Sequence, residues 1–272
     1  MNARIRMAPS KKDTFVLSFY GGGDNVDNSR DLQLPADFLE QLKARGFNPP
    51  AQGFDANNPS LNISDVRHTA NLGVGAIWTR RVNARVQLRA NVGYSSFQDT
   101  RSRSVGGNTQ APNGEHDSLS DLTAHAAMPI SIAIGHNLEA GAEVTTNVSS
   151  YTLRGGPPGP RNGSPLASLF DQNVRGTQTS GYVQDEWLIK SKLFLSAGAR
   201  ATRFDRSDQT YLDPRVAVSL PVSAAVTLKA AAGTYHQVTS QITREDLLQG
   251  NRQFWSVADN ALAKRNFRKN IQ

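Results

Sequence analysis

Side chains that could do chemistry are present, but they are not grouped. Five histidines occur singly, without the His-Glu-x-x-His spacing of a zinc site: His68, His116, His125, His136 and His236. Asp185 and Glu186 are adjacent in an apparent strand, where neighbouring side chains point to opposite faces, so they cannot act as a catalytic carboxylate pair. The sequence has no cysteine, which excludes disulfides and thiolate chemistry. We predict that the chain is not an enzyme and holds no metal and no cofactor.

The stretch from Asn137 to Tyr151 shows the kind of element that carries these side chains. Apolar residues share one face and mostly polar residues share the other: Leu138, Ala140, Ala142 and Val144 against Glu139, Gly141, Glu143 and Thr145. A period of two residues indicates a β-strand. Strands in soluble domains usually end after about five or six residues. This strand is therefore expected to be unusually long.

The same alternation recurs along the chain and predicts about nine long strands. They are expected at residues 12–23, 68–82, 86–102, 118–128, 132–153, 177–189, 193–205, 210–220 and 226–237. Tight turns are expected near Val82, Pro129, Ser191 and Ser223, and most of the connections at the other strand ends are longer. A short helix is expected at residues 35–47.

This sorting of connections by length is typical of outer-membrane barrels, which have short periplasmic turns and long external loops. Only 38% of the residues are hydrophobic and the mean hydropathy is −0.46, which suits a barrel because only every second strand residue meets lipid. No stretch approaches the roughly 18 apolar residues that a membrane helix needs. Several aromatic residues lie towards expected strand ends, as at a membrane interface: Trp78, Tyr94, Tyr151, Tyr182, Trp187 and Tyr235. We predict an all-β fold, namely an antiparallel transmembrane β-barrel segment that is an open curved sheet if isolated.

The basic charge balance raises the question of nucleic acid. The formal net charge is +7 and the isoelectric point is near 9.9. The 30 lysines and arginines are scattered, however, without a basic run that interleaves with aromatic residues. We predict no nucleic-acid partner.

A set of motifs, taken in order, resembles a known family. The strand "GYVQDEW" at residues 181–187 is followed by "LSAGARATRFD", "YLDPRVAVSL" and "TLKAAAGTYHQ". Earlier pieces, "FVLSFYGGGDNVDNSRDL" and "HNLEAGAEVT", also fit. The chain resembles the barrel portion of TonB-dependent outer-membrane receptors over roughly residues 12–258.

The resemblance implies a location in the cell outer membrane and contact with its lipid. The intact family takes up small nutrients of the siderophore, cobalamin or glycan class with energy relayed by the TonB complex. The long loops at residues 24–64 and 154–176 would face outwards and contribute to ligand capture. Six polar residues have the strand parity to face the lumen: Glu139, Glu143, Glu186, Arg200, Arg215 and Lys229. They are expected either as solvated lumen charges or as part of a substrate site.

The expected organisation departs from the complete family pattern. Residues 1–11 are expected as a non-native or turn-like lead-in, 12–237 as a partial barrel, and 238–272 as an external loop and divergent tail, with the plug domain absent. On this interpretation the chain is a receptor fragment that is inactive by itself. Two alternatives stay open: a small self-contained porin-like or structural barrel, and a soluble β-sandwich binding module.

Overall fold

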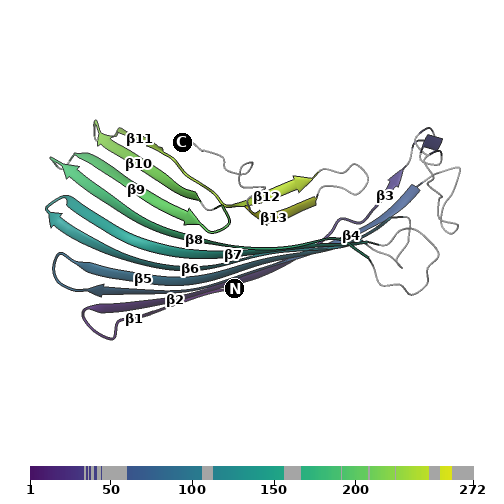
Figure 1. Ribbon diagram of the computed structural model, residues 1–272, viewed down its shortest axis with the longest axis horizontal. Helices are drawn as coiled ribbons and strands as arrows, with labels where there is room; N and C mark the ends of the chain where they lie inside the picture. The colour runs from purple at the N-terminus through teal and green to yellow at the C-terminus, as the bar shows by residue number, and fades with distance from the viewer. Residues whose placement is uncertain are drawn as a thin grey trace.

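One large antiparallel sheet and one separate hairpin make up the described structure (Figure 1). The computed structural model describes residues 1–33, 35, 37, 40, 41, 44, 60–105, 113–155, 167–190, 192–207, 209–223, 225–244 and 252–258. Within these residues, no helix is long and apolar enough to cross a membrane.

The large sheet has eleven strands, each bonded to its neighbours in sequence. They are β1 (Asn2–Met7), β2 (Asp13–Asp27), β3 (Arg30–Gln33), β4 (Ser60–Arg81), β5 (Gln87–Val105), β6 (Asn113–Ala133), β7 (His136–Gly155), β8 (Ala167–Ile189), β9 (Leu193–Phe204), β10 (Gln209–Pro221) and β11 (Thr227–Gly233). Only β3 leaves the linear order, because it pairs with β4 beyond the end of β2. The second sheet is the hairpin of β12 (Thr239–Arg244) and β13 (Arg252–Val257).

The predicted all-β fold and its long strands are confirmed. Strands β2 and β4 to β11 lie where the alternation predicts them, and several run further than expected. The longest are β4 with 22 residues and β8 with 23. Their extensions at residues 60–64 and 167–176 enter the segments 24–64 and 154–176 and continue the ladders with mostly polar residues.

Four short strands were not predicted. Strand β1 lies within the expected lead-in and pairs with β2, while β12 and β13 lie within the expected external loop. Strand β3 is only four residues long and lacks a clear period of two. The helix expected at residues 35–47 falls largely outside the described residues.

The turn expected near Pro129 is wrong. Strand β6 continues to Ala133, and the chain reverses at Ile134 and Gly135. Pro129 lies where the β5–β6 ladder is interrupted, between its last continuous pair, Arg89 with Ala127, and an isolated bridge of Val86 with Ile130, which is where a residue without an N–H is tolerated. Gly135 makes the turn because its φ of 70° lies in the left-handed region.

Short turns close one end of the sheet, which we call the turn end; the opposite end is the loop end. In three turns a side chain accepts a backbone N–H: Ser10 Oγ from Asp13 at 3.0 Å, Asn83 Oδ1 from Val86 at 2.9 Å, and Ser223 Oγ from Val226 at 3.1 Å. Such local bonds favour a tight reversal, since they replace part of the ladder that ends there.

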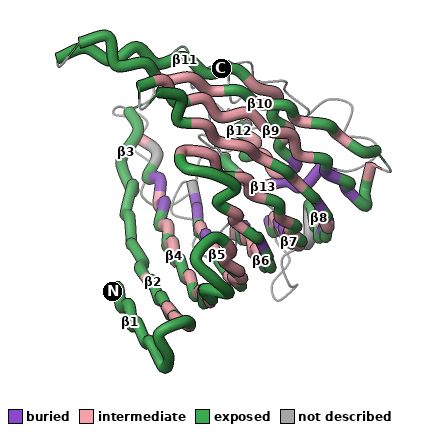
Figure 2. Tube along the Cα trace, turned by 90° about the vertical axis from the view of Figure 1, so that its left-hand side faces the viewer, coloured by how far each residue is buried: buried purple, intermediate pink, exposed green. Residues whose placement is uncertain are grey.

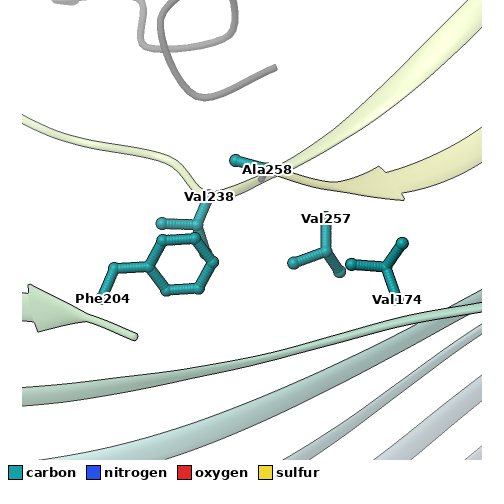
Figure 3. Packing of buried hydrophobic residues seen from close by; sticks show 5 residues of the cluster. All are labelled: Val174, Phe204, Val238, Val257 and Ala258. Atoms are coloured by element: carbon teal, nitrogen blue, oxygen red, sulfur yellow. The ribbon is translucent and has the colours of Figure 1, made fainter. Parts of the chain in front are cut away.

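The large sheet curves, and the β12–β13 hairpin lies on its concave side against β6, β7 and β8 (Figure 1). Much of the sheet is half-buried or exposed, and buried residues are confined to a few stretches (Figure 2). A compact cluster of buried hydrophobic side chains joins the hairpin to the sheet (Figure 3): Val174, Phe204, Val238, Val257 and Ala258. The core of the described structure is therefore small and sits under the hairpin.

Candidate functional site

The convex face carries an apolar band. One residue from each of six strands illustrates it, with exposed fractions between 42% and 53%: Val74, Val92, Leu122, Val144, Val183 and Val216. Register places these residues on the face opposite to the hairpin. So many exposed apolar side chains in one continuous band are unusual for a surface in contact with water. The band is suited to contact with hydrocarbon.

The concave face is polar, and a hydrogen-bonded network crosses its middle. Tyr182 Oη donates to Glu139 Oε1 at 2.7 Å and lies 2.9 Å from His125 Nε2. The rings of Tyr182 and His125 are stacked with an interplanar angle of 7°. Arg89 Nη1 lies 3.8 Å from Glu139 Oε2. Side chains from β5, β6, β7 and β8 are thereby connected across the sheet.

Glycine makes room for this network. Tyr182 is the cross-strand partner of Gly141, and a Cβ at Gly141 would lie only 2.6 Å from the tyrosine ring. Gly198, the register partner of Gln184, would place a Cβ 2.7 Å from the Val183 carbonyl oxygen. The close approaches expected of strand glycines are thus present here.

The six predicted polar residues all share the concave face by register. Arg200 bonds Glu143 and also donates from Nη2 to Ser180 Oγ at 2.6 Å. Glu139 belongs to the network above, and Glu186 accepts a bond from Gln184 at 2.9 Å. The structure therefore brings Glu143 and Arg200 together, while Glu186 lies nearer the turn end.

The other two predicted residues lie towards the open edge of the sheet. Arg215 lines a cavity of about 200 Å³ together with Arg200, Asp213 and His236. Its Nε is buried and has no hydrogen-bond partner in the described part of the chain. Lys229 is on β11, opposite Ser219 of β10. These six residues therefore do not form one compact site, and their role as lumen-facing groups stays a prediction.

A second cavity of about 290 Å³ lies at the turn end. Polar residues line much of it, among them Gln87, Glu139, Gln184 and Glu186. No group of three or more His, Asp or Glu side chains in the described residues is arranged to hold a metal ion. These hollows offer hydrogen-bond donors and acceptors, which suits binding rather than bond-making chemistry.

Towards the loop end, ion pairs line the concave face. Arg67 Nε donates to both carboxylate oxygens of Asp99 at 2.8 and 2.9 Å, and Arg101 bonds Asp65 from Nε and Nη2 at 2.6 and 2.5 Å. Hydrogen bonding from Arg101 lowers the pKa of the Asp65 carboxyl, against the opposing effect of burial. The same bond raises the pKa of the Arg101 guanidinium.

The hairpin is held by side chains from two adjacent strands. The backbone N–H of Trp255 donates to Asp117 Oδ1 and Oδ2 at 3.1 and 3.2 Å, and Ser149 Oγ donates to the Trp255 carbonyl at 2.6 Å. The ring of Tyr151 stacks on Phe254 with centroids 4.5 Å apart. Burial raises the pKa of the Asp117 carboxyl to about 6, and the charge of Asp99 acts in the same direction.

Sequence reasoning missed this loop-end site. Two aromatic residues expected at a membrane interface, Tyr151 and Tyr182, instead lie on the concave face. The positions of Tyr151 and Tyr182 along their strands could have revealed this placement, because the register puts both side chains on the same face as Glu139 and Glu143. Asp117 and Ser149 gave no signal, since their partner is more than a hundred residues away in sequence.

Comparisons with known proteins agree with this architecture. The family model described as TonB dependent receptor-like, beta-barrel matches residues 8–254. The search of curated proteins found no match. A structure of the RagAB peptide transporter aligns with a TM-score of 0.53 and 12% identity, over 95% of this chain and 35% of that chain. The ferric enterobactin receptor of Pseudomonas aeruginosa, in a mutant form, aligns with a TM-score of 0.37 and 12% identity, over 87% of this chain and 43% of that one.

These alignments bear on fold and extent only. At 12% identity, the likeness to the RagAB structure shows the fold alone. The chain spans about a third of the length of the RagAB chain that it matches, since the aligned share of that chain is 35%.

Proposed function

Because the chain belongs to the TonB-dependent receptor-like β-barrel family, we propose that it forms part of the wall of an outer-membrane receptor for energised nutrient uptake. The family consists of receptors and transporters of the outer membrane and is not enzymatic. In this proposal residues 12–237 form the wall, with β1 as an added edge strand. Its convex face meets lipid along the apolar band, and the loop-end parts of the strands, which carry Asp65, Arg101 and Asp117, lie outside the membrane. The concave face meets the lumen, through which a nutrient of the siderophore, cobalamin or glycan class passes with energy relayed by TonB.

The contrast between the two faces carries the proposal. The convex face exposes Val74, Leu122 and Val183, whereas the concave face carries the network of Tyr182, Glu139 and their partners. A water-soluble sheet would bury one face and solvate the other. Here the apolar face is exposed, and this arrangement is expected of a barrel wall with lipid outside and polar groups inside. The long loop-end extensions of β4 and β8 would then project outwards.

The open edges of the large sheet determine whether the chain can enclose a channel by itself. In the described residues, β1 and β11 each pair on one side only. A sheet that does not close encloses no channel, so we propose that the chain transports nothing until both edges are paired by further strands.

Tryptophan quenching by brominated lipid tests the placement of the two faces. Trp78 and Trp187 lie on the convex face by register, whereas Trp255 lies in the hairpin on the concave side. Each single-tryptophan variant would be refolded into vesicles of brominated phosphatidylcholine. We expect strong quenching of Trp78 and Trp187 and little quenching of Trp255. Equal quenching of all three, or none, would contradict the proposal.

A planar-bilayer recording separates the wall fragment from the porin-like alternative. The same refolded chain should give no steady single-channel conductance, because its edges are open. A reproducible conductance step would favour a self-contained barrel and remove the proposal of inactivity. A chain that stays monomeric in water without detergent would favour the β-sandwich.

A further inference from the structure

We infer that the wall beneath the β12–β13 hairpin is a binding site for an extended peptide segment, and that residues 252–258 occupy it as an internal stand-in for that ligand. This inference rests on the proposed function, because it places a ligand on the lumen side of the sheet. The wall is formed by Asp117 of β6, Ser149 and Tyr151 of β7, Val174 of β8 and Phe204 of β9.

The first argument is that the wall recognises a backbone. Asp117 accepts the N–H of Trp255 and Ser149 donates to the carbonyl of the same residue. Both wall side chains are almost fully buried, with exposed fractions of 3% for Asp117 and 4% for Ser149. Leaving such groups unpaired in the interior is unfavourable, so the site selects an occupant that offers one amide N–H and one carbonyl at this spacing. An extended peptide offers both at every residue.

The second argument is that side-chain recognition surrounds this backbone clamp. Tyr151 stacks on Phe254, and Val174 and Phe204 pack with Val257. Phe204 is fully buried and closes over Gly176, where a Cβ would meet its ring at 2.6 Å. Peptide sites commonly combine main-chain hydrogen bonds for affinity with pockets for alternate side chains. The wall therefore favours an aromatic residue with an aliphatic residue three positions later, as in Phe254 and Val257.

The third argument is that the occupant is separable from the wall. The hairpin is a sheet of its own, and none of the backbone ladders in the described residues joins it to the large sheet. It is held by the small cluster of Val174, Phe204, Val238, Val257 and Ala258, by the stacking of Tyr151 on Phe254, and by the bonds of Asp117 and Ser149 to the Trp255 backbone. A segment held in this way can be exchanged for a ligand that makes the same contacts, since the wall itself is fixed by the β6–β9 ladders.

The test uses the whole chain refolded in brominated-lipid vesicles and a capped, fluorescently labelled peptide with the sequence of residues 253–258, QFWSVA. Anisotropy would give its dissociation constant. We expect weak binding to the wild type, because the hairpin occupies the site. Val257→Ser weakens the hairpin but leaves the wall intact, and it should tighten binding about tenfold by freeing a larger fraction of sites. Phe254→Ser is a second such variant, in case the first disturbs folding.

Two controls address the clamp and the wall. A peptide with a methyl group on the Trp backbone nitrogen cannot donate to Asp117, and it should bind the Val257→Ser chain at least tenfold more weakly. Tyr151→Ser combined with Val257→Ser should remove binding. Equal binding of the methylated peptide, or no binding to either hairpin variant, would overturn the inference. Quenching of Trp78 and Trp187 in the same vesicles separates the outcomes, because loss of binding with quenching intact refutes this site and leaves the proposed function standing.

Discussion

At Asp117, burial and a neighbouring charge act together. Its carboxyl lies under the hairpin, near Arg67 of β4, Asp99 of β5 and the Trp255 N–H of β13, and has a pKa raised to about 6. The raised pKa means that the folded state favours the protonated carboxyl. The stability that this gives is fully present below about pH 4, the usual value for an aspartate, and is lost as the pH rises through about 6.

We therefore expect the docked hairpin to loosen as the pH rises from about 4 to about 6. The fluorescence of a chain with Trp255 as its single tryptophan, followed in urea at each pH, would report the docking midpoint. The midpoint should fall with rising pH in the wild type and be flatter in Asp117→Asn, which cannot ionise. Asp65 stays ionised over this range because its pKa is lowered, so its pairing with Arg101 does not confuse the comparison. Superimposable pH profiles of the wild type and Asp117→Asn would show that Asp117 does not cause the pH dependence of docking.

Phe204 provides the largest apolar contact under the hairpin. Its side chain is 0% exposed, and Phe204→Ala should destabilise the docked hairpin by roughly 3–5 kcal/mol, as measured by denaturant unfolding in detergent micelles. Phe194→Ala is the matched control on the same strand, because Phe194 is 37% exposed and should cost much less. Equal losses from the two variants would show that Phe204 has no special packing role.

Prediction from sequence succeeded where local parity decides the outcome. The shared face of Glu139, Glu143 and Arg200 follows from counting along strands, and the register agrees. It failed at Asp117 and Ser149, whose meaning depends on a partner brought from β13. Nothing in the residues around them encodes that distant contact.

Among the turns, Gly135 is the position with the strictest requirement. Its φ is 70°, and a Cβ would lie 2.9 Å from the Leu188 carbonyl oxygen. Gly135→Ala should therefore destabilise the β6–β7 hairpin by about 1–2 kcal/mol in urea titrations of the micelle-bound chain. Gly114→Ala is the control in the same strand pair, since a Cβ there meets nothing within 4 Å. It should be neutral or slightly stabilising, and a similar loss at both positions would refute the argument.

The long strands could be predicted because their apolar faces repeat every second residue, as in Leu138, Ala140 and Ala142. Their ends could not, because Asp24 to Asp27 and Gly114 to Asp117 extend the ladders with polar residues. The turn after β6 was misplaced because proline usually ends a strand, whereas Pro129 lies at an interruption of the β5–β6 ladder and the strand continues past it.

In the part of the chain that the structure describes, the large sheet has two edges, β1 and β11, that are paired on one side only and differ in protection. On the concave side, β1 carries Arg4 and Arg6, whereas β11 has Ala231 between Lys229 and Gly233. We expect the β11 edge to drive self-association, because an edge with few charges is a template for further strands. Ala231→Lys should weaken association on the order of tenfold in detergent, as measured by analytical ultracentrifugation.

The control adds the same charge one strand inward. Ala217 is the register partner of Ala231 on the same face but belongs to β10, whose two sides are both paired. Ala217→Lys should leave association unchanged. If both variants weaken association equally, net charge rather than the β11 edge is responsible.

The β12–β13 hairpin and its docking on the large sheet could not be predicted from the sequence. Residues 238–258 were expected only as a loop, because β12 and β13 are six residues each and the connection between them is polar. Their position depends on the curvature of the large sheet, which is a property of many strands together. Curvature and long-range docking are therefore the parts of the fold that local patterns leave open.

Neighbour-only pairing has a consequence for how such a chain can change over time. Among the described residues, and apart from β3, each strand of the large sheet is bonded to the strands next to it in sequence and to no others. Duplication or loss of one complete strand–turn–strand unit would shift no other register, and it would leave the direction of the flanking strands unchanged. The width of the sheet can therefore evolve in steps of two strands, and the contacts that govern folding speed stay local in sequence.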